Sequence, residues 1–177
     1  PPGEALAARK PLGRADLPTA SYTEMMEWVL PTIARQTFHA LQQEFGDRQD
    51  LLRFVRGGFW RGFFTKYAEA NLLHKKMLRV SSKLHCGTRK GLKSSAGRAE
   101  AITHLLRSQC NDAYWHGIFG GLYAPHLRTA LWRELILAET LADAALHAPA
   151  KYQVVTMLDF DADGLEEIEL SSPVFAA

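Results

Sequence analysis

The sequence predicts a mainly α-helical chain, in which a bundle of about five to seven helices is followed by a truncated β-hairpin. Apolar residues recur at the spacing of an amphipathic helix through most of the chain, whereas after Pro149 the spacing changes to the two-residue alternation of a strand. The 177 residues, 47% apolar and 23% charged, are typical of a globular protein. No apolar run reaches the length of a membrane-spanning helix.

A helical domain is expected over residues 21–148, after a segment of residues 1–20 that is predicted to be a linker. The linker contains four prolines and shows little periodicity. The first helix is expected to begin at Ser21, because Ser21-Tyr22-Thr23-Glu24 is a capping box whose serine and glutamate side chains satisfy backbone amides. Pro31 either kinks this helix or opens a second one at its first turn.

The remaining helices follow from the spacing of apolar residues and from the breaks between them. They are expected around residues 33–45, 51–55, 63–84, 101–109 and 125–145. Arg56-Gly57-Gly58 is interpreted as a flexible break, and the segment 86–97, with three glycines and two serines, as a loop. Pro125 is well placed as the first residue of the last helix, because a helix start does not need the amide hydrogen that proline lacks.

The last segment, residues 150–177, is expected to hold the first strands of a β domain. Residues 152–158 and 165–170 read as two strands, and Asp161-Ala162-Asp163-Gly164 between them predicts a hairpin turn. Asp159, Asp161 and Asp163 also match the first half of a calcium-binding loop. The twelfth position of that loop is Leu170 rather than a bidentate glutamate, so the turn is favoured and a weak calcium site stays an open alternative.

Charge is distributed unevenly, although the net charge is only +2. Eight basic residues and no acid lie between Lys75 and Arg98, and six acids and no base lie between Asp159 and Glu169. One interpretation is a basic helical module that binds nucleic acid or another polyanion through Lys75–Arg98. The other is a solvated helix end followed by a lysine-rich loop. The basic run holds no aromatic residue and no recognised nucleic-acid motif, which disfavours a nucleic-acid partner.

The most unusual stretch of sequence is Asn111–Tyr123. Its 13 residues contain four aromatics, a histidine, a carboxylate and three glycines, without helical or strand periodicity. Aromatic rings beside a carboxylate suit a sugar site, because a ring stacks on the apolar face of a pyranose and the carboxylate accepts from its hydroxyls. Asp112 and Trp115 are therefore expected to be functional. Three further aromatics are expected to anchor the loop to the helices: Tyr114, Phe119 and Tyr123.

This stretch and three others resemble glycoside hydrolase family 57, in its 4-α-glucanotransferase and α-amylase branch. NDAYWHGIFGGLYAPHLR (residues 111–128) is similar to the last conserved sequence region of that family. LPTASYTEMMEW (17–28) resembles the segment after its catalytic barrel, and GGFWRGFFTKYAEANLLHKKML (57–78) resembles its central helical domain. DFDADGLEEIEL (159–170) resembles the opening hairpin of its C-terminal β-sandwich. The four matches stand in the family's order.

The resemblance implies a fragment of a retaining enzyme that hydrolyses or transfers α-1,4-glucans, with this chain as the helical wall of the glucan-binding cleft. It implies that Asp112 and Trp115 bind glucose units beside the scissile bond, with His116 next to them, and that Trp28 lines the cleft. Retention requires a carboxylate nucleophile and a second carboxyl group about 5 Å away. In the family both lie on the barrel, and nothing in residues 1–20 matches them. No catalytic residue is therefore expected, and the chain alone is expected to be inactive.

The partners implied by the resemblance are an α-1,4-glucan or maltooligosaccharide and, within the same enzyme, the catalytic barrel and the C-terminal β-sandwich. No cofactor, metal site or membrane partner is expected. The N-terminal residues lack the apolar core of a signal peptide. Cys86 and Cys110 lack metal-ligand spacing, which fits reduced thiols in a cytoplasmic protein.

Overall fold

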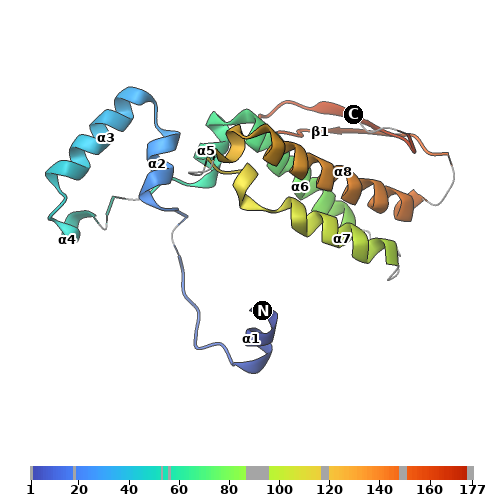
Figure 1. Cartoon of the computed structure of the whole chain (residues 1–177), viewed down its shortest axis with the longest axis horizontal. Coiled ribbons are helices and arrows are strands. Elements are labelled where there is room, and N and C mark those ends of the chain that lie inside the picture. The colour runs from blue at the N-terminus through green and yellow to red at the C-terminus, as the bar shows by residue number, and fades with distance from the viewer. Residues whose placement is uncertain are drawn as a thin grey trace. The chain divides into compact units, whose positions relative to one another are not determined.

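The computed structural model describes residues 2–17, 19–52, 54–55, 57–86, 96–116, 120–147 and 151–174. These residues contain eight α-helices, two short 3-10 helices and one antiparallel hairpin (Figure 1), which confirms the mainly α-helical class with a C-terminal hairpin. The chain divides into two compact units, Pro1–Lys66 (unit 1) and Tyr67–Ala177 (unit 2). No helix in the described part of the chain is both long enough and apolar enough to cross a membrane.

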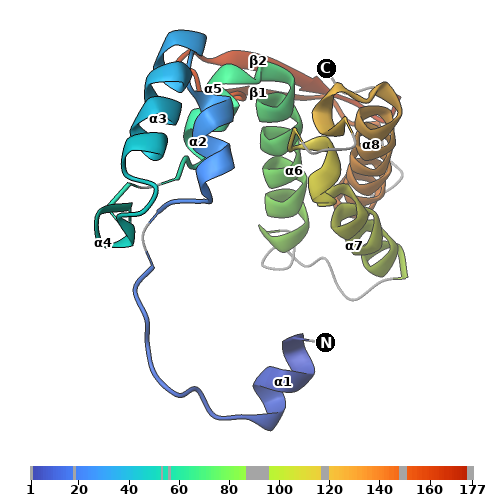
Figure 2. The same ribbon diagram turned by 60° about the vertical axis from the view of Figure 1, so that its left-hand side comes forward.

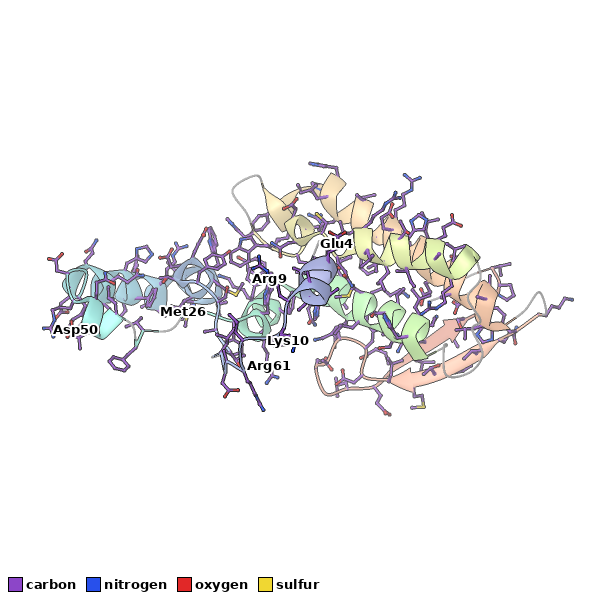
Figure 3. All side chains as sticks on the ribbon, turned by 90° about the horizontal axis from the view of Figure 1, so that it is seen from below. Glu4, Arg9, Lys10, Met26, Asp50 and Arg61 are labelled. Atoms are coloured by element: carbon purple, nitrogen blue, oxygen red, sulfur yellow. The ribbon has the colours of Figure 1, made fainter. Side chains whose placement is uncertain are left out.

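Unit 1 carries five of the described α-helices. Its helices are α1 (Pro2–Ala8), α2 (Thr23–Val29), α3 (Thr32–Glu44), α4 (Gln49–Leu52) and α5 (Trp60–Lys66). Helix α1 falls in the segment that was expected to be a linker, and Figure 3 labels the exposed Glu4 on it and Arg9 and Lys10 directly after it. Pro31 precedes α3 with φ −59°, so it opens a second helix and does not kink the first.

The core of unit 1 lies between α2 and α5. Met25 of α2 and Phe63 of α5 are almost completely buried, at 1% and 0% exposure. The Trp60 ring stacks on the Phe64 ring with their centroids 5.3 Å apart. The core of unit 1 therefore combines Met25 of α2 with an aromatic cluster on α5, whose rings bury a large apolar area per residue.

The start of α2 is held by a close backbone approach and not by a capping box. The N-cap residue is Tyr22, without a side-chain cap hydrogen bond, so the expected capping box at Ser21 is wrong. The Ser21 amide donates instead to the Gly58 carbonyl at 2.6 Å. A Cβ atom on Gly57 would lie 2.1 Å from the Ser21 carbonyl oxygen. Gly57 and Gly58 thus allow close packing against the start of α2. The expected break does fall between α4 and α5, although Arg56 lies outside the described residues. Its flexibility stays a prediction.

Unit 2 is built on three helices, α6 (Ala68–Cys86), α7 (Ala96–Ser108) and α8 (Pro125–His147), which lie side by side in Figure 2. The helix expected over residues 63–84 is two helices, α5 and α6, because the helical hydrogen bonding is interrupted at Tyr67. Helix α8 begins at Pro125, as expected. The buried core of unit 2 joins all three helices through large apolar side chains, among them Leu73, Leu84, Leu105, Leu131 and Leu135.

The C-terminal hairpin consists of β1 (Val154–Leu158) and β2 (Glu167–Ser171), with Thr156 opposite Glu169. It is attached to α6 by polar contacts. The Asn71 side-chain amide donates to the Asp161 carbonyl at 2.6 Å, and the Arg79 guanidinium pairs with the Glu169 carboxylate. The turn between the strands carries Asp159, whose carboxylate accepts from the amides of Asp163 and Gly164 at 3.0 Å each. The hairpin predicted from the turn residues is confirmed.

Tyr114 provides a first test of the packing in unit 2. Its ring is 6% exposed and its hydroxyl donates to the buried Ser108 carbonyl at 2.8 Å. Burial raises the pKa of the Tyr114 phenol, so the donor proton is retained. We expect Tyr114→Phe to lower the free energy of unfolding by about 1–3 kcal/mol, because it leaves a buried carbonyl without this donor. Denaturant unfolding measures the loss. Tyr152→Phe, whose hydroxyl donates to Ser172 at 3.1 Å, is the control and should change stability less.

Candidate functional site

The candidate site in unit 2 is the segment that connects α7 to α8. We call residues 111–123 the Asp112 loop; residues 117–119 of it lie outside the described residues. It contains two single-turn 3-10 helices, η2 (Asn111–Ala113) and η3 (Gly121–Tyr123). The amides of Tyr114 and Trp115 donate to the Asn111 carbonyl at 3.0 and 3.1 Å, and the Leu122 amide donates to the Trp115 carbonyl at 2.9 Å. The last of these bonds joins the two halves of the loop.

Gly121 allows the two halves of the loop to meet. Its φ of +46° lies in the left-handed region, and a Cβ atom on it would lie 2.0 Å from the His116 carbonyl oxygen and 2.1 Å from that of Trp115. A side chain at this position would collide with backbone, which has no rotamer to move away. The absence of a Cβ at Gly121 therefore allows the conformation of the loop.

The Asp112 loop carries one charged side chain, that of Asp112, next to residues that are buried in the core. Ala113 and Tyr114 are 1% and 6% exposed and belong to the core formed by α6, α7 and α8. Asp112, by contrast, is exposed. The thiol of Cys110 donates to its carboxylate over 3.6 Å. The carboxylate is thus held on a backbone that the core fixes, while its oxygen atoms remain accessible to a ligand.

The two other candidates on this loop, Trp115 and His116, differ in exposure. The Trp115 side chain is buried, at 8% exposure, and His116 is half-buried. Their rings meet edge to face with centroids 6.4 Å apart. The loop therefore brings together the rings of Trp115 and His116, and the Trp115 ring is largely enclosed.

The three aromatics expected to anchor the loop do not behave alike. Tyr114 is buried and acts as an anchor. Tyr123 is 53% exposed, although its hydroxyl donates to the Tyr67 hydroxyl at 3.0 Å. Phe119 lies outside the described residues. The sequence pattern could not separate Tyr114 from Tyr123, because both are tyrosines in a segment without periodicity.

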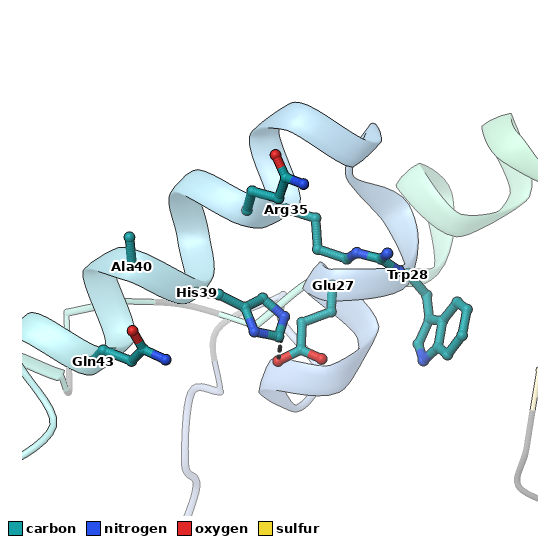
Figure 4. Close-up of a pocket in the computed structure, with 7 residues that line it drawn as sticks. Glu27, Trp28, Arg35, His39, Ala40 and Gln43 are labelled. Carbon is teal, nitrogen blue, oxygen red and sulfur yellow. Dashed lines mark ion pairs between the residues drawn. The ribbon is translucent and has the colours of Figure 1, made fainter.

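Trp28 lies in unit 1, at the end of α2, and lines a hollow of about 420 Å³ between α2 and α3. The walls are mostly polar: Glu27, Arg35, Gln36, His39 and Gln43 accompany Ala40 and Trp28. Figure 4 shows His39 of α3 facing Glu27 of α2, with 3.7 Å between His39 Nε2 and a Glu27 carboxylate oxygen, while the Trp28 ring points away from this pair. Helical spacing in the sequence does not reveal the polar residues around Trp28.

The buried carboxylates of the described residues form ion pairs. Glu139 accepts from Lys76 at 2.5 Å and from Lys83 at 3.0 Å, and Lys83 also pairs with Asp143 at 2.8 Å. Burial alone would raise the pKa of Glu139, but the bonds and charges of Lys76 and Lys83 outweigh it and hold this pKa below its ordinary value. This carboxylate stays ionised, whereas a general acid needs a raised pKa.

Three members of the basic run are held in ion pairs and are not presented to solvent as a stripe. Lys76 and Lys83 pair with α8, and Arg79 pairs with β2. Their side chains are 13%, 21% and 24% exposed. Arg89, Lys90 and Lys93 lie outside the described residues. The described part of the run therefore gives no support to a polyanion-binding surface.

Three acidic side chains at the hairpin turn lie close enough to one another to bind a cation together. Among the described residues, Asp159, Asp161 and Glu167 each offer an oxygen within 4.8 Å of the others. The Asp159 and Glu167 carboxylates already accept backbone amides of the turn, from Asp163, Gly164 and Phe160. These bonds explain the turn without a metal, and Asp163 of the sequence motif is not part of the group.

The Asp112 loop is also supported by an ion pair between α8 and α6. Arg128 of α8 donates to the Leu122 carbonyl at 2.5 Å and to the Glu69 carboxylate at 2.7 Å. Glu69 lies on α6, two residues after Tyr67. Nothing in the spacing of these residues indicates a pair, because 59 positions separate Glu69 from Arg128.

Comparisons with known proteins agree with one another. Residues 58–142 match the family described as "Alpha-amylase/4-alpha-glucanotransferase, middle domain". Alpha-amylase 1 of Dictyoglomus thermophilum is 43% identical over 169 residues, which cover 94% of this chain and 23% of that protein. The 4-alpha-glucanotransferase of Thermococcus kodakarensis is 40% identical over 177 residues, covering 98% of this chain and 24% of that protein.

A solved structure is similar over the same extent. The crystal structure of 4-alpha-glucanotransferase from Thermococcus litoralis matches with a TM-score of 0.65 and 38% sequence identity, covering 97% of this chain and 24% of that one. The chain thus spans about a quarter of the length of the relatives it matches.

Proposed function

Because the chain belongs to the alpha-amylase/4-alpha-glucanotransferase family, in the middle region of glycoside hydrolase family 57, we propose that it forms a helical wall of an α-1,4-glucan-binding cleft. The enzyme that carries this wall hydrolyses or transfers α-1,4-glucans with retention of configuration. A catalytic barrel and a C-terminal β-sandwich of the same enzyme are its intramolecular partners. Relatives about four times as long as this chain support that organisation.

The observation that carries the proposal is the exposed Asp112 carboxylate on a loop fixed by the core. A sugar hydroxyl donates a charge-assisted hydrogen bond to such a carboxylate. Trp115 and His116 follow on the same loop and are proposed to complete this site. Because Ala113 and Tyr114 are buried beside it, Asp112 loses little conformational freedom when a sugar binds. Trp28 is proposed as a further glucan contact, supported by the polar hollow that it lines.

The proposal assigns binding, and not bond cleavage, to this chain. A retaining mechanism needs two carboxyl groups about 5 Å apart, one of them a proton donor. Glu139 and Asp143 are the buried acids of the described residues, and both are neutralised by lysines. The lowered pKa of Glu139 does not suit a proton donor. The chain by itself is therefore proposed to be inactive. A cytoplasmic location is also proposed, supported by the two cysteines without disulfide or metal-ligand spacing.

The proposal predicts that Asp112→Asn in the full-length protein lowers kcat/KM on maltoheptaose by about 10- to 100-fold, because a hydrogen bond to a charged group contributes about 1.5–3 kcal/mol. Trp115→Phe should also lower it. Phe keeps most of the packing of the buried ring, whereas Ala at this position would remove it. Steady-state kinetics measure both effects, and thermal unfolding checks that each variant folds.

The control is Asp47→Asn, which changes an exposed aspartate in a turn of unit 1 and should leave kcat/KM unchanged. Unchanged kinetics in Asp112→Asn would contradict the role of this carboxylate. Salt provides a second check, because polyanion binding weakens steeply as the salt concentration rises, whereas glucan binding should depend on salt only weakly.

A further inference from the structure

Tyr123 is an exposed aromatic residue whose ring is held in place. It ends η3 and is 53% exposed. The His116 ring meets it at 89° with centroids 5.4 Å apart, and the Tyr67 ring meets it at 75° with centroids 6.1 Å apart. Its hydroxyl donates to the Tyr67 hydroxyl at 3.0 Å. An exposed tyrosine on a surface loop usually has few such contacts, so this ring is oriented in advance of any ligand.

The backbone around Tyr123 is fixed in the same way. Leu122, immediately before it, accepts from the Arg128 guanidinium at 2.5 Å, and the same guanidinium donates to Glu69 at 2.7 Å. Glu69 is 52% exposed and lies two residues after Tyr67. A carboxylate on α6, a guanidinium on α8, the phenol of Tyr123 on η3 and the phenol of Tyr67 just before α6 are thus linked by these contacts. Polar groups placed around an aromatic ring are what a sugar site requires.

The exposure of the loop aromatics decides which ring is available to a ligand. Trp115 is 8% exposed and Tyr114 is 6% exposed, so neither ring presents a free face. Among the described residues of the Asp112 loop, Tyr123 is the aromatic with more than half of its surface exposed. Because Tyr123 donates to Tyr67, the lone pairs of its own hydroxyl oxygen can accept from a ligand hydroxyl.

We propose that Tyr123, oriented by Tyr67 and His116, contacts a pyranose unit of the α-1,4-glucan in addition to Asp112. The ring stacks on the apolar face of the sugar, and the hydroxyl accepts from a sugar hydroxyl. Tyr67 and His116 are positioning residues in this site. The inference rests on the proposed function, because it places a further contact in the same glucan-binding wall.

The test compares side chains of similar size at Tyr123 in the full-length protein. Binding of a thio-linked maltoheptaose analogue, which a glycosidase does not cleave, is measured by calorimetry. Tyr123→Leu retains an apolar side chain but cannot stack, and should raise Kd about 3- to 10-fold, the range of an aromatic contact. Tyr123→Phe retains the ring and should raise Kd less than Tyr123→Leu does. In steady-state kinetics on maltoheptaose, Tyr123→Leu should raise KM and leave kcat nearly unchanged.

The matched control is Phe54→Ala in unit 1, an aromatic residue that is 72% exposed, which should leave Kd unchanged. Equal Kd values for Tyr123→Leu and wild type would overturn the inference, and so would equal losses in the Leu and Phe variants, since stacking would then contribute nothing. If Asp112→Asn weakens binding while Tyr123→Leu does not, the proposed function stands and this inference fails. If the wild-type protein neither binds nor cleaves maltooligosaccharides, the proposed function itself fails.

Discussion

Gly121→Ala is expected to lower the free energy of unfolding of unit 2 by about 3–5 kcal/mol. Two effects add. The left-handed φ of +46° is strained for any residue with a Cβ, and that Cβ would lie 2.0 Å from the His116 carbonyl oxygen. The second effect forces the backbone at Trp115 and His116 to move. The substitution should therefore also displace Asp112 and lower kcat/KM of the full-length protein, measured together with chemical denaturation.

Gly164→Ala provides the matched control for this experiment. Gly164 has φ +96° in the hairpin turn, but a Cβ atom there meets nothing within 4 Å. Gly164→Ala should lower the free energy of unfolding by about 1–2 kcal/mol, because of backbone strain alone, and should leave kcat/KM unchanged. Equal destabilisation in Gly121→Ala and Gly164→Ala would show that the two halves of the Asp112 loop do not meet at Gly121.

Glu139→Gln is the second substitution with a large expected effect. It should lower the free energy of unfolding by about 3–5 kcal/mol. Glu139 is 5% exposed and accepts from Lys76 and Lys83. Gln has nearly the same shape as Glu but carries no charge. The ammonium groups of Lys76 and Lys83, which are mostly shielded from water, would therefore lose a negative partner. Removal of one partner from a buried ion pair is costly for this reason, even where the intact pair contributes little net stability. Urea unfolding measures the change.

The same cluster predicts how stability depends on pH. The pKa of Glu139 lies below its ordinary value of 4.5, so its stabilisation is present above pH 4.5 and is lost as the pH falls through the folded pKa. For Lys83, burial alone would lower the pKa, but the bonds and charges of Asp143 and Glu139 raise it above 10.5. That stabilisation is present below pH 10.5 and is lost as the pH rises through the folded pKa. Glu139→Gln should flatten the acid limb of Tm against pH.

Asp50→Asn is the control for the ion cluster. Asp50 pairs with Arg48 at 2.8 Å, but both side chains are more than half exposed. A pair of this kind is screened by water, so its removal should leave Tm unchanged within error. If Asp50→Asn lowered Tm as much as Glu139→Gln does, burial would not explain the contribution of Glu139 to stability.

The fold was largely predictable because its helices are amphipathic. Apolar spacing located α3 and α8 to within a few residues, and proline located their starts. The same spacing merged α5 with α6 and placed the start of α7 at residue 101 instead of Ala96, which was expected to lie in a loop. The break at Tyr67 and the packing at Gly57 were not predictable in this way. Both depend on contacts between distant segments, such as the approach of Gly57 to the Ser21 carbonyl, which local sequence does not encode.

The candidate site was predictable to the level of the loop. The composition of residues 111–123 and the family resemblance, which the match over residues 58–142 confirms, both directed attention to Asp112 and Trp115. The roles of Asp112, Trp115, His116 and Trp28 in binding stay predictions. Which tyrosine is buried could not be read from sequence, because Tyr114 and Tyr123 differ only in the tertiary neighbours they meet. The polar hollow at Trp28 was missed for the same reason.

The attachment of the hairpin to α6 has a consequence for the order of folding. Its two polar contacts, Asn71 with Asp161 and Arg79 with Glu169, each join residues 90 positions apart. Helices α7 and α8, by contrast, are separated by a single loop. Closing a longer segment of chain costs more entropy, so distant contacts form later than local ones. We therefore expect helices α7 and α8 to pair before the hairpin docks onto α6, which hydrogen exchange during refolding measures.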